Sequence, residues 1–241
     1  MASLAAAWPV LLPAAAMLAG GGIALRWNPG GAARSAIQHF TAGVVIAAVA
    51  AELVPSLHLG QSTLAMAVGF LFGVAAMLAV KKFAGEEGEA EGTTSGPVGP
   101  FVVTIGIDLA VDGLLCGVTL AASSGGGEVV VGALALEVLF LGVATVVSLR
   151  NRGMAPGRLA GILAGLAVLI PVGGFAGYGL FGAAPGWLQI AVLAFATAAL
   201  LYLVFEELLA EAHEGEADTA VTTAMLFLGF LIVLVIKATL D

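Results

Sequence analysis

Charged side chains are scarce in this sequence. They make up 10% of its 241 residues, against about 25% in typical soluble domains. Apolar residues make up 61%, and the mean hydropathy is +1.11. These few charged groups could not cover the surface of a water-soluble chain. The composition therefore excludes a soluble globular domain and predicts a membrane protein.

Basic clusters and cysteine pairs are also missing. The chain has 8 lysines and arginines against 16 acidic residues, a net charge of −8. These few basic residues form no patch that would neutralise nucleic-acid phosphates, so no nucleic-acid partner is expected. Cys116 is the only cysteine, which excludes a disulfide within the chain. The lipid bilayer is therefore the first predicted partner.

Long apolar runs dominate what remains. About 20 apolar residues cross the ~30 Å of hydrocarbon as a helix, and backbone groups in lipid must bond within their own segment, which favours helices. The prediction is an all-α polytopic protein with one transmembrane domain over residues 1–241. Its eight expected spans are 4–25, 37–59, 63–82, 100–122, 129–149, 158–182, 187–209 and 219–239.

Seven of the eight basic residues fall on the same side of the predicted membrane domain. Only Lys237 lies on the other side. The remaining seven are Arg26, Arg34, Lys81, Lys82, Arg150, Arg152 and Arg158. The positive-inside rule then makes their side cytoplasmic and places both termini outside. The expected location is the cell's inner (plasma) membrane.

Residues 84–99 form the longest polar connection. They hold Glu86, Glu87, Glu89 and Glu91, followed by glycine, threonine, serine and proline. This composition cannot build a packed core. It predicts a flexible cytoplasmic loop.

The second and seventh spans end in the same motif. Glu52-Leu-Val-Pro-Ser-Leu-His58 and Glu207-Leu-Leu-Ala-Glu-Ala-His213 both read Glu-Leu-x-x-x-x-His. The two spans run in opposite directions, so the motif points to opposite faces of the membrane. This predicts an inverted repeat of helices 1–3 and 6–8 around helices 4–5, an arrangement common in transporters.

Three carboxylates are expected near the bilayer midplane. Asp108 and Asp112 are four residues apart on the fourth span and share a helix face, and Glu137 lies at similar depth on the fifth. An ionised carboxylate there costs at least ~2.5–3.5 kcal/mol, so it usually faces the bundle interior. Oxygen ligands suit hard divalent cations. The sequence predicts a metal site of these three residues, with Cys116, one turn further along, as ordinary packing.

Further polar residues lie toward the two mouths. Glu52 and His58 are pathway or gate candidates on the outer side, and Glu206, Glu207 and His213 on the inner side. No lysine or arginine is expected at the depth of any of these carboxylates.

These residues resemble the ZIP family of divalent metal transporters, especially its short bacterial branch. The resemblance covers nearly the whole chain. It rests on the topology, the loop at 84–99, the segment Asp108-Leu-Ala-Val-Asp112-Gly113 and the acidic end of the seventh span at Glu206-Glu207. It implies eight helices with both termini outside, and a metal centre between helices 4 and 5.

The chain departs from the family in one pattern. Asp108, Asp112 and Glu137 fall on the positions of the family's first metal site. Apolar residues fall on the positions of its second site, namely Leu109, Val138 and Ile170. The resemblance therefore implies one carboxylate-rich site, and a divalent ion (zinc, manganese, iron or another) as transported substrate. We expect a transporter and not an enzyme, with a second copy of the chain as a candidate partner.

Two other functions stay open at this stage. A non-transporting ZIP-like protein would sense metal or conduct protons through the same carboxylates. An intramembrane aspartyl protease would use a dyad of carboxylates, for which Asp108 and Glu137 are the only plausible pair.

Overall fold

The computed structural model describes residues 4–26, 30–57, 62–88, 98–122, 127–213 and 219–240. In this part of the chain the regular structure is entirely helical, and eight helical segments are long and apolar enough to cross a membrane. The spans are Ala7–Ala24, Gly31–Ser56, Thr63–Lys82, Phe101–Ala122, Gly127–Asn151, Pro156–Ala183, Gly186–Glu206 and Ala220–Thr239. The chain is a polytopic all-α membrane protein, as predicted.

Three of the spans are assembled from more than one helical segment. The first consists of the 3-10 helix η1 (Leu4–Val10) and α1 (Leu11–Ala24). The second consists of α2 (Gly31–Ala48), the π-helix η2 (Val49–Leu53) and α3 (Val54–Ser56). The seventh consists of α8 (Gly186–Leu203) and the first residues of the π-helix η3 (Val204–Leu208), and α9 (Leu209–His213) continues beyond its end. The single-helix spans are α4 (Thr63–Gly88), α5 (Val98–Ala122), α6 (Gly127–Asn151), α7 (Pro156–Ala183) and α10 (Ala220–Leu240).

Two predicted boundaries need correction. The second span begins at Gly31 and not at residue 37, because residues 31–36 include alanines and Arg34, which favour a helix. The interval predicted as a loop, 84–99, is helical at both ends: α4 continues to Gly88, and α5 begins at Val98. Alanine and glutamate are strong helix formers, so α4 extends past its apolar part. Residues 89–97 lie outside the described residues.

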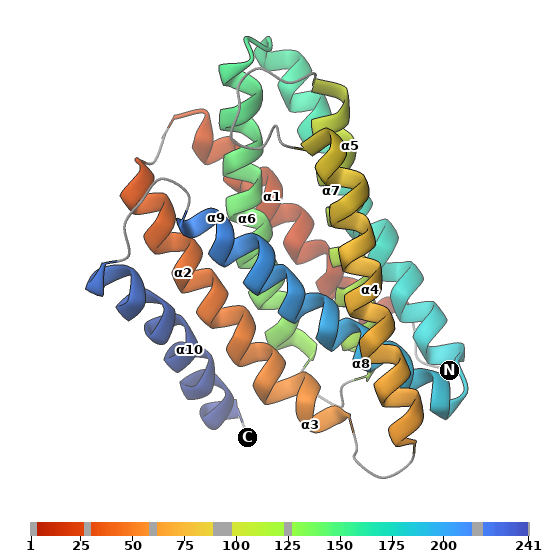
Figure 1. Cartoon of the computed structure of the whole chain (residues 1–241). Coiled ribbons are helices and arrows are strands. Elements are labelled where there is room, and N and C mark those ends of the chain that lie inside the picture. Colours follow the sequence, from red (N-terminus) through yellow and green to blue (C-terminus); the bar gives the residue numbers. More distant parts are fainter. Residues whose placement is uncertain are drawn as a thin grey trace.

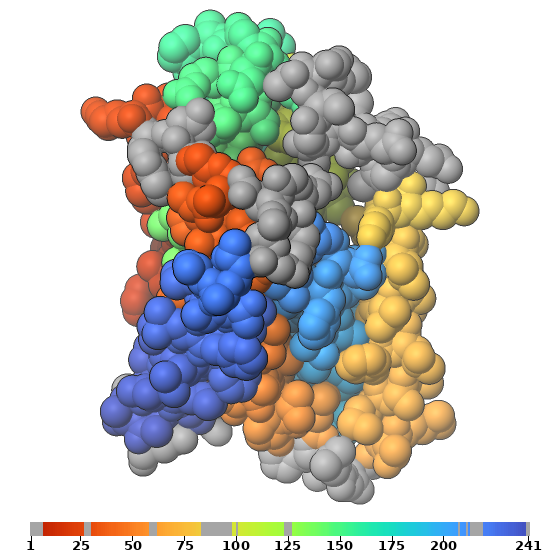
Figure 2. All heavy atoms as spheres, turned by 60° about the vertical axis from the view of Figure 1, so that its left-hand side comes forward, coloured from red at the N-terminus to blue at the C-terminus, as the bar shows by residue number. Residues whose placement is uncertain are grey.

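The spans form two layers (Figure 1). The helices α10, α2, α8 and α4 lie side by side in one layer, and α1, α5, α6 and α7 lie behind them. Figure 2 shows the front layer in the order α10, α2, α8, α4. Seven basic residues lie at the same end of the bundle, which we call the basic end: Arg26, Arg34, Lys81, Lys82, Arg150, Arg152 and Arg158.

Helix pairing follows the predicted inverted repeat. The most extensive contacts join α1 to α6, α5 to α7, α2 to α10 and α4 to α8. Exchanging the first three spans with the last three, and α5 with α6, converts the α1–α6 pair into α7–α5. The same exchange converts the α2–α10 pair into α8–α4. The exchange therefore converts each helix pair into another observed pair, whose helices run in the opposite direction across the membrane.

Glycines let these pairs approach closely. A Cβ at Gly20 of α1 would lie 1.9 Å from the carbonyl oxygen of Leu139, and one at Gly142 of α6 would lie 2.4 Å from that of Met17. The counterpart pair α5–α7 shows the same reciprocal arrangement, with glycines of each helix against carbonyls of the other. Membrane helices pack through such small residues because lipid supplies no hydrophobic force between them.

Buried apolar side chains form two cores. One lies within the rear layer and is made by α1, α5, α6 and α7. The other joins the two layers and includes residues of α2, η2, α8 and η3 together with the far halves of α5 and α6. The helices α5 and α6 thus pass from one core into the other near the middle of their spans.

Candidate carboxylate site

Two carboxylates lie where the two cores meet. Asp112 of α5 is fully buried, and Glu137 of α6 is 5% exposed. On α5, Leu109 belongs to the rear core and Leu115 to the core between the layers. On α6, the same change of core occurs across Glu137. Both acids are therefore buried near the middle of their spans, between apolar regions that belong to different sets of helices.

Cys116 lies one turn beyond Asp112 on α5. Its thiol is fully buried. Asp108, one turn before Asp112, is only half-buried. Asp108, Asp112 and Cys116 follow one another at a spacing of four residues on α5, so they share a face of that helix.

The predicted set of three carboxylates is not assembled around one point in this conformation. Among the described residues, no group of three or more histidine, cysteine, aspartate or glutamate side chains is arranged to hold a metal ion. Binding of a cation by Asp108, Asp112 and Glu137 together would require side-chain or helix movement.

The apolar positions next to these acids are deeply buried. Leu109, Val138 and Ile170 are each fully buried and belong to the rear core. A Cβ at Gly113 would lie 2.1 Å from the carbonyl oxygen of Ile170, so α5 and α7 are in backbone contact there. Apolar side chains fill the interior around Leu109, Val138 and Ile170. The buried polar groups here are the carboxylates of Asp112 and Glu137.

The two π-helices occur at matching positions. In η2 the N–H of Val54 donates to the carbonyl of Val49, and in η3 the N–H of Leu209 donates to that of Val204. Each π-helix includes the glutamate that begins the repeated motif, Glu52 in the first and Glu207 in the second. Single π turns inside α-helices are frequent at functional sites. The motif and the backbone distortion therefore coincide in both halves.

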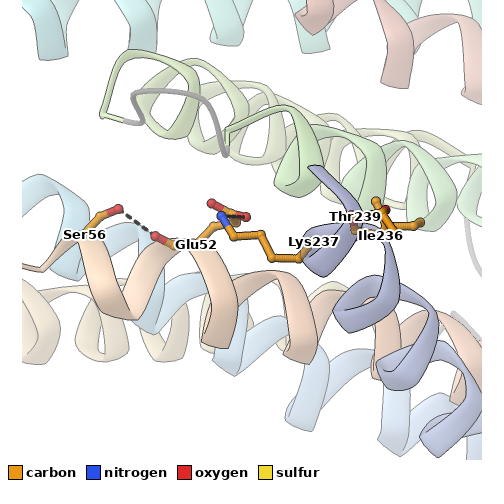
Figure 3. Close-up of polar contacts among 5 residues, drawn as sticks. All are labelled: Glu52, Ser56, Ile236, Lys237 and Thr239. Atoms are coloured by element: carbon orange, nitrogen blue, oxygen red, sulfur yellow. Dashed lines mark hydrogen bonds and ion pairs between the residues drawn. The ribbon is translucent and has the colours of Figure 1, made fainter. Parts of the chain in front are cut away.

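Lysines pair with glutamates of these π-helices. The Lys237 Nζ of α10 lies 2.8 Å from Glu52 Oε1 (Figure 3). At the basic end, the Lys81 Nζ of α4 lies 2.5 Å from Glu206 Oε2. The expectation that no basic residue shares the depth of these carboxylates is therefore wrong for Glu52 and Glu206.

The other predicted mouth residues are described only in part. His58 lies outside the described residues. The backbones of Glu207 and His213 belong to η3 and α9, whereas their side chains lie outside the described part of the structure. Their roles stay predictions.

Sequence reasoning missed both lysine partners and both π-helices. The repeated Glu-Leu-x-x-x-x-His motif marked the place of the π-helices without indicating the extra backbone residue. Lys237 was visible as the single basic residue away from the basic end. Its isolation was the signal that a buried acid partner on another helix was needed.

Comparison of the sequence with protein-family models gives no match, and comparison with curated proteins gives none either.

Proposed function

We propose that this chain is a divalent metal cation transporter of the ZIP type, with one carboxylate-rich site between α5 and α6. The observation that carries the proposal is the burial of Asp112 and Glu137 at the junction of two cores. Intramembrane carboxylates are costly and usually mark an ion pathway. An inverted repeat around such a site is the architecture on which many transporters alternate between two openings.

In this proposal Asp108, Asp112 and Glu137 bind the ion, and the basic end faces the cytoplasm. The cation is substrate, and its binding would draw the half-buried Asp108 toward the other two acids. Relative movement of the two layers then changes which mouth reaches the site, since the rear layer carries all three acids on α5 and α6. Glu52 lies on the path to the outside, and Glu206 on the path to the cytoplasm.

Metal flux into proteoliposomes tests this function. The wild-type chain would be compared for Mn²⁺, Fe²⁺, Zn²⁺, Mg²⁺, Ca²⁺ and Cd²⁺ with the Asp112→Asn variant, which keeps the side-chain size and removes the charge. We expect the variant to lose at least about 90% of the flux, because removing a charged ligand weakens cation binding and each loss of about 1.4 kcal/mol is a factor of ten. Glu128→Gln is the matched control, since Glu128 is an exposed acid at the start of α6.

A proton pathway or a non-transporting sensor is the second candidate. The absence of a three-ligand group among the described residues favours it, because two buried acids suffice to pass a proton. Proton flux that needs Asp112 and Glu137, with no flux of any of the six metals, would establish this function in place of metal transport.

A further inference from the structure

Two similar ion pairs join the halves of the inverted repeat. Glu52 in η2 pairs with Lys237 of α10, and Glu206 in η3 pairs with Lys81 of α4. The exchange that relates the halves converts α2 and α10 into α8 and α4, so both pairs join equivalent helices. Lys237 is the 18th of the 21 residues of α10, and Lys81 is the 19th of the 26 residues of α4, so both lie in the last third of their helices. The second pair uses Glu206, one residue before the motif position.

Both lysines are partly exposed, and Lys237 is more exposed than its glutamate partner. The Lys237 side chain is 29% exposed while that of Glu52 is 6% exposed, so the ammonium can leave toward the surface and the carboxylate stays inside. Lys81 and Glu206 are about half exposed, at 54% and 49%. A lysine ammonium is a compact single charge on a flexible stem. It can be withdrawn from its partner without backbone movement.

The backbone around Glu52 is held by a local hydrogen bond and by a contact with α6. Ser56 Oγ donates a 2.6 Å hydrogen bond to the Glu52 carbonyl, as Figure 3 shows, which satisfies a backbone group next to the π turn. The η2 segment also contacts α6, the helix that carries Glu137. A cation bound at Glu52 would therefore be held beside the helix of the transport site.

We propose that Lys237 and Lys81 are tethered counter-cations that a divalent ion displaces from the mouth glutamates during transit. This inference rests on the proposed transport function. A divalent ion brings two charges to the carboxylate and replaces one, whereas a monovalent ion offers no more charge than the lysine it must displace. The lysines therefore set a threshold that favours divalent over monovalent cations at both mouths.

Equilibrium binding of Mn²⁺ to the purified full chain, followed by electron paramagnetic resonance of the free ion, tests the inference. Lys237→Met should raise the Mn²⁺ affinity about fivefold, the effect of removing one competing charge at a partly exposed pair. It should also make Mn²⁺ binding more sensitive to competition by Na⁺. Lys237→Arg retains the charge and should stay near wild type, and the double variant Glu52→Gln/Lys237→Met should lose the gain.

Lys82→Met is the matched control, because it removes the same charge from an exposed lysine adjacent to Lys81. An unchanged or lower Mn²⁺ affinity in a folded Lys237→Met protein would overturn the inference. If that variant does not fold, Lys81→Met carries the same test at the basic end. Wild-type flux with no affinity gain in the variants refutes the counter-cation role alone, whereas an affinity gain without any wild-type flux refutes transport alone.

Discussion

At the scale of single residues, the chain concentrates its intramembrane charge at a few acids. Asp112 and Glu137 lie near the middle of α5 and α6, where an ionised carboxylate costs at least about 2.5–3.5 kcal/mol. Nearby apolar positions, including Leu109 and Val138, are fully buried in the rear core. A cost of this size at two neighbouring positions is consistent with a cation or proton that binds there during function.

Uptake should weaken as the medium becomes acidic. A protonated carboxylate cannot bind a cation, so each proton that the ion must displace lowers binding by up to about tenfold per pH unit on the acidic side. The measurement is Mn²⁺ uptake into proteoliposomes from pH 8 to pH 5, with equal pH on both sides. Uptake that rises toward acid would contradict the prediction and favour coupling to protons.

The residue types of the site were predictable, but their partners were not. Hydropathy and spacing placed Asp108, Asp112 and Glu137 at one depth, because a charge stands out in an apolar run. The partners of Glu52 and Glu206 come from helices 185 and 125 residues away along the chain. No local pattern encodes such distances, so only the packing of α2 on α10 and of α8 on α4 brings these pairs together.

At the scale of the helical element, small residues determine how closely the helices pack. Gly20 of α1 lies against the Leu139 carbonyl of α6, whereas Gly22 in the same helix has open space at its Cβ. Hydropathy predicted the spans to within several residues, since about 20 apolar residues are needed to cross the bilayer. It could not predict the π turns of η2 and η3, because one extra residue in a turn leaves the composition unchanged.

Gly20→Ala should destabilise the protein, because the new methyl group would lie 1.9 Å from a backbone oxygen and force α1 away from α6. We expect a loss of about 1–3 kcal/mol, the usual cost of overpacking. Gly22→Ala is the matched control and should be neutral or stabilising, since alanine is the better helix former. Thermal unfolding in detergent checks both variants, and equal midpoints would contradict the close contact.

At the scale of the whole molecule, the inverted repeat places equivalent helix pairs at the two ends of the bundle. The two ends nevertheless differ in charge. Seven basic residues lie at one end, and the eight spans place the first and last described residues at the other. The repeat was predictable because its motif survives in both halves. The layering was not, since it depends on which helices pair.

Labelling of single cysteines should place the basic end in the cytoplasm. In a Cys116→Ala background, Ala155→Cys at the turn between α6 and α7 should react with a membrane-impermeant reagent only after the membrane is opened. Ala183→Cys at the far end of α7 should react in intact cells, and both positions are exposed. The reverse pattern would invert the proposed orientation and exchange the roles of the two mouths.

The matching π turns also bear on the origin of the molecule. A π turn corresponds to one residue more than the regular helix needs, and η2 and η3 carry it at the same position relative to the shared motif. Two independent insertions would have to coincide to the residue. If the halves descend from one duplicated segment, the ancestral three-helix segment already had the extra residue. The distortion is then older than the eight-helix protein.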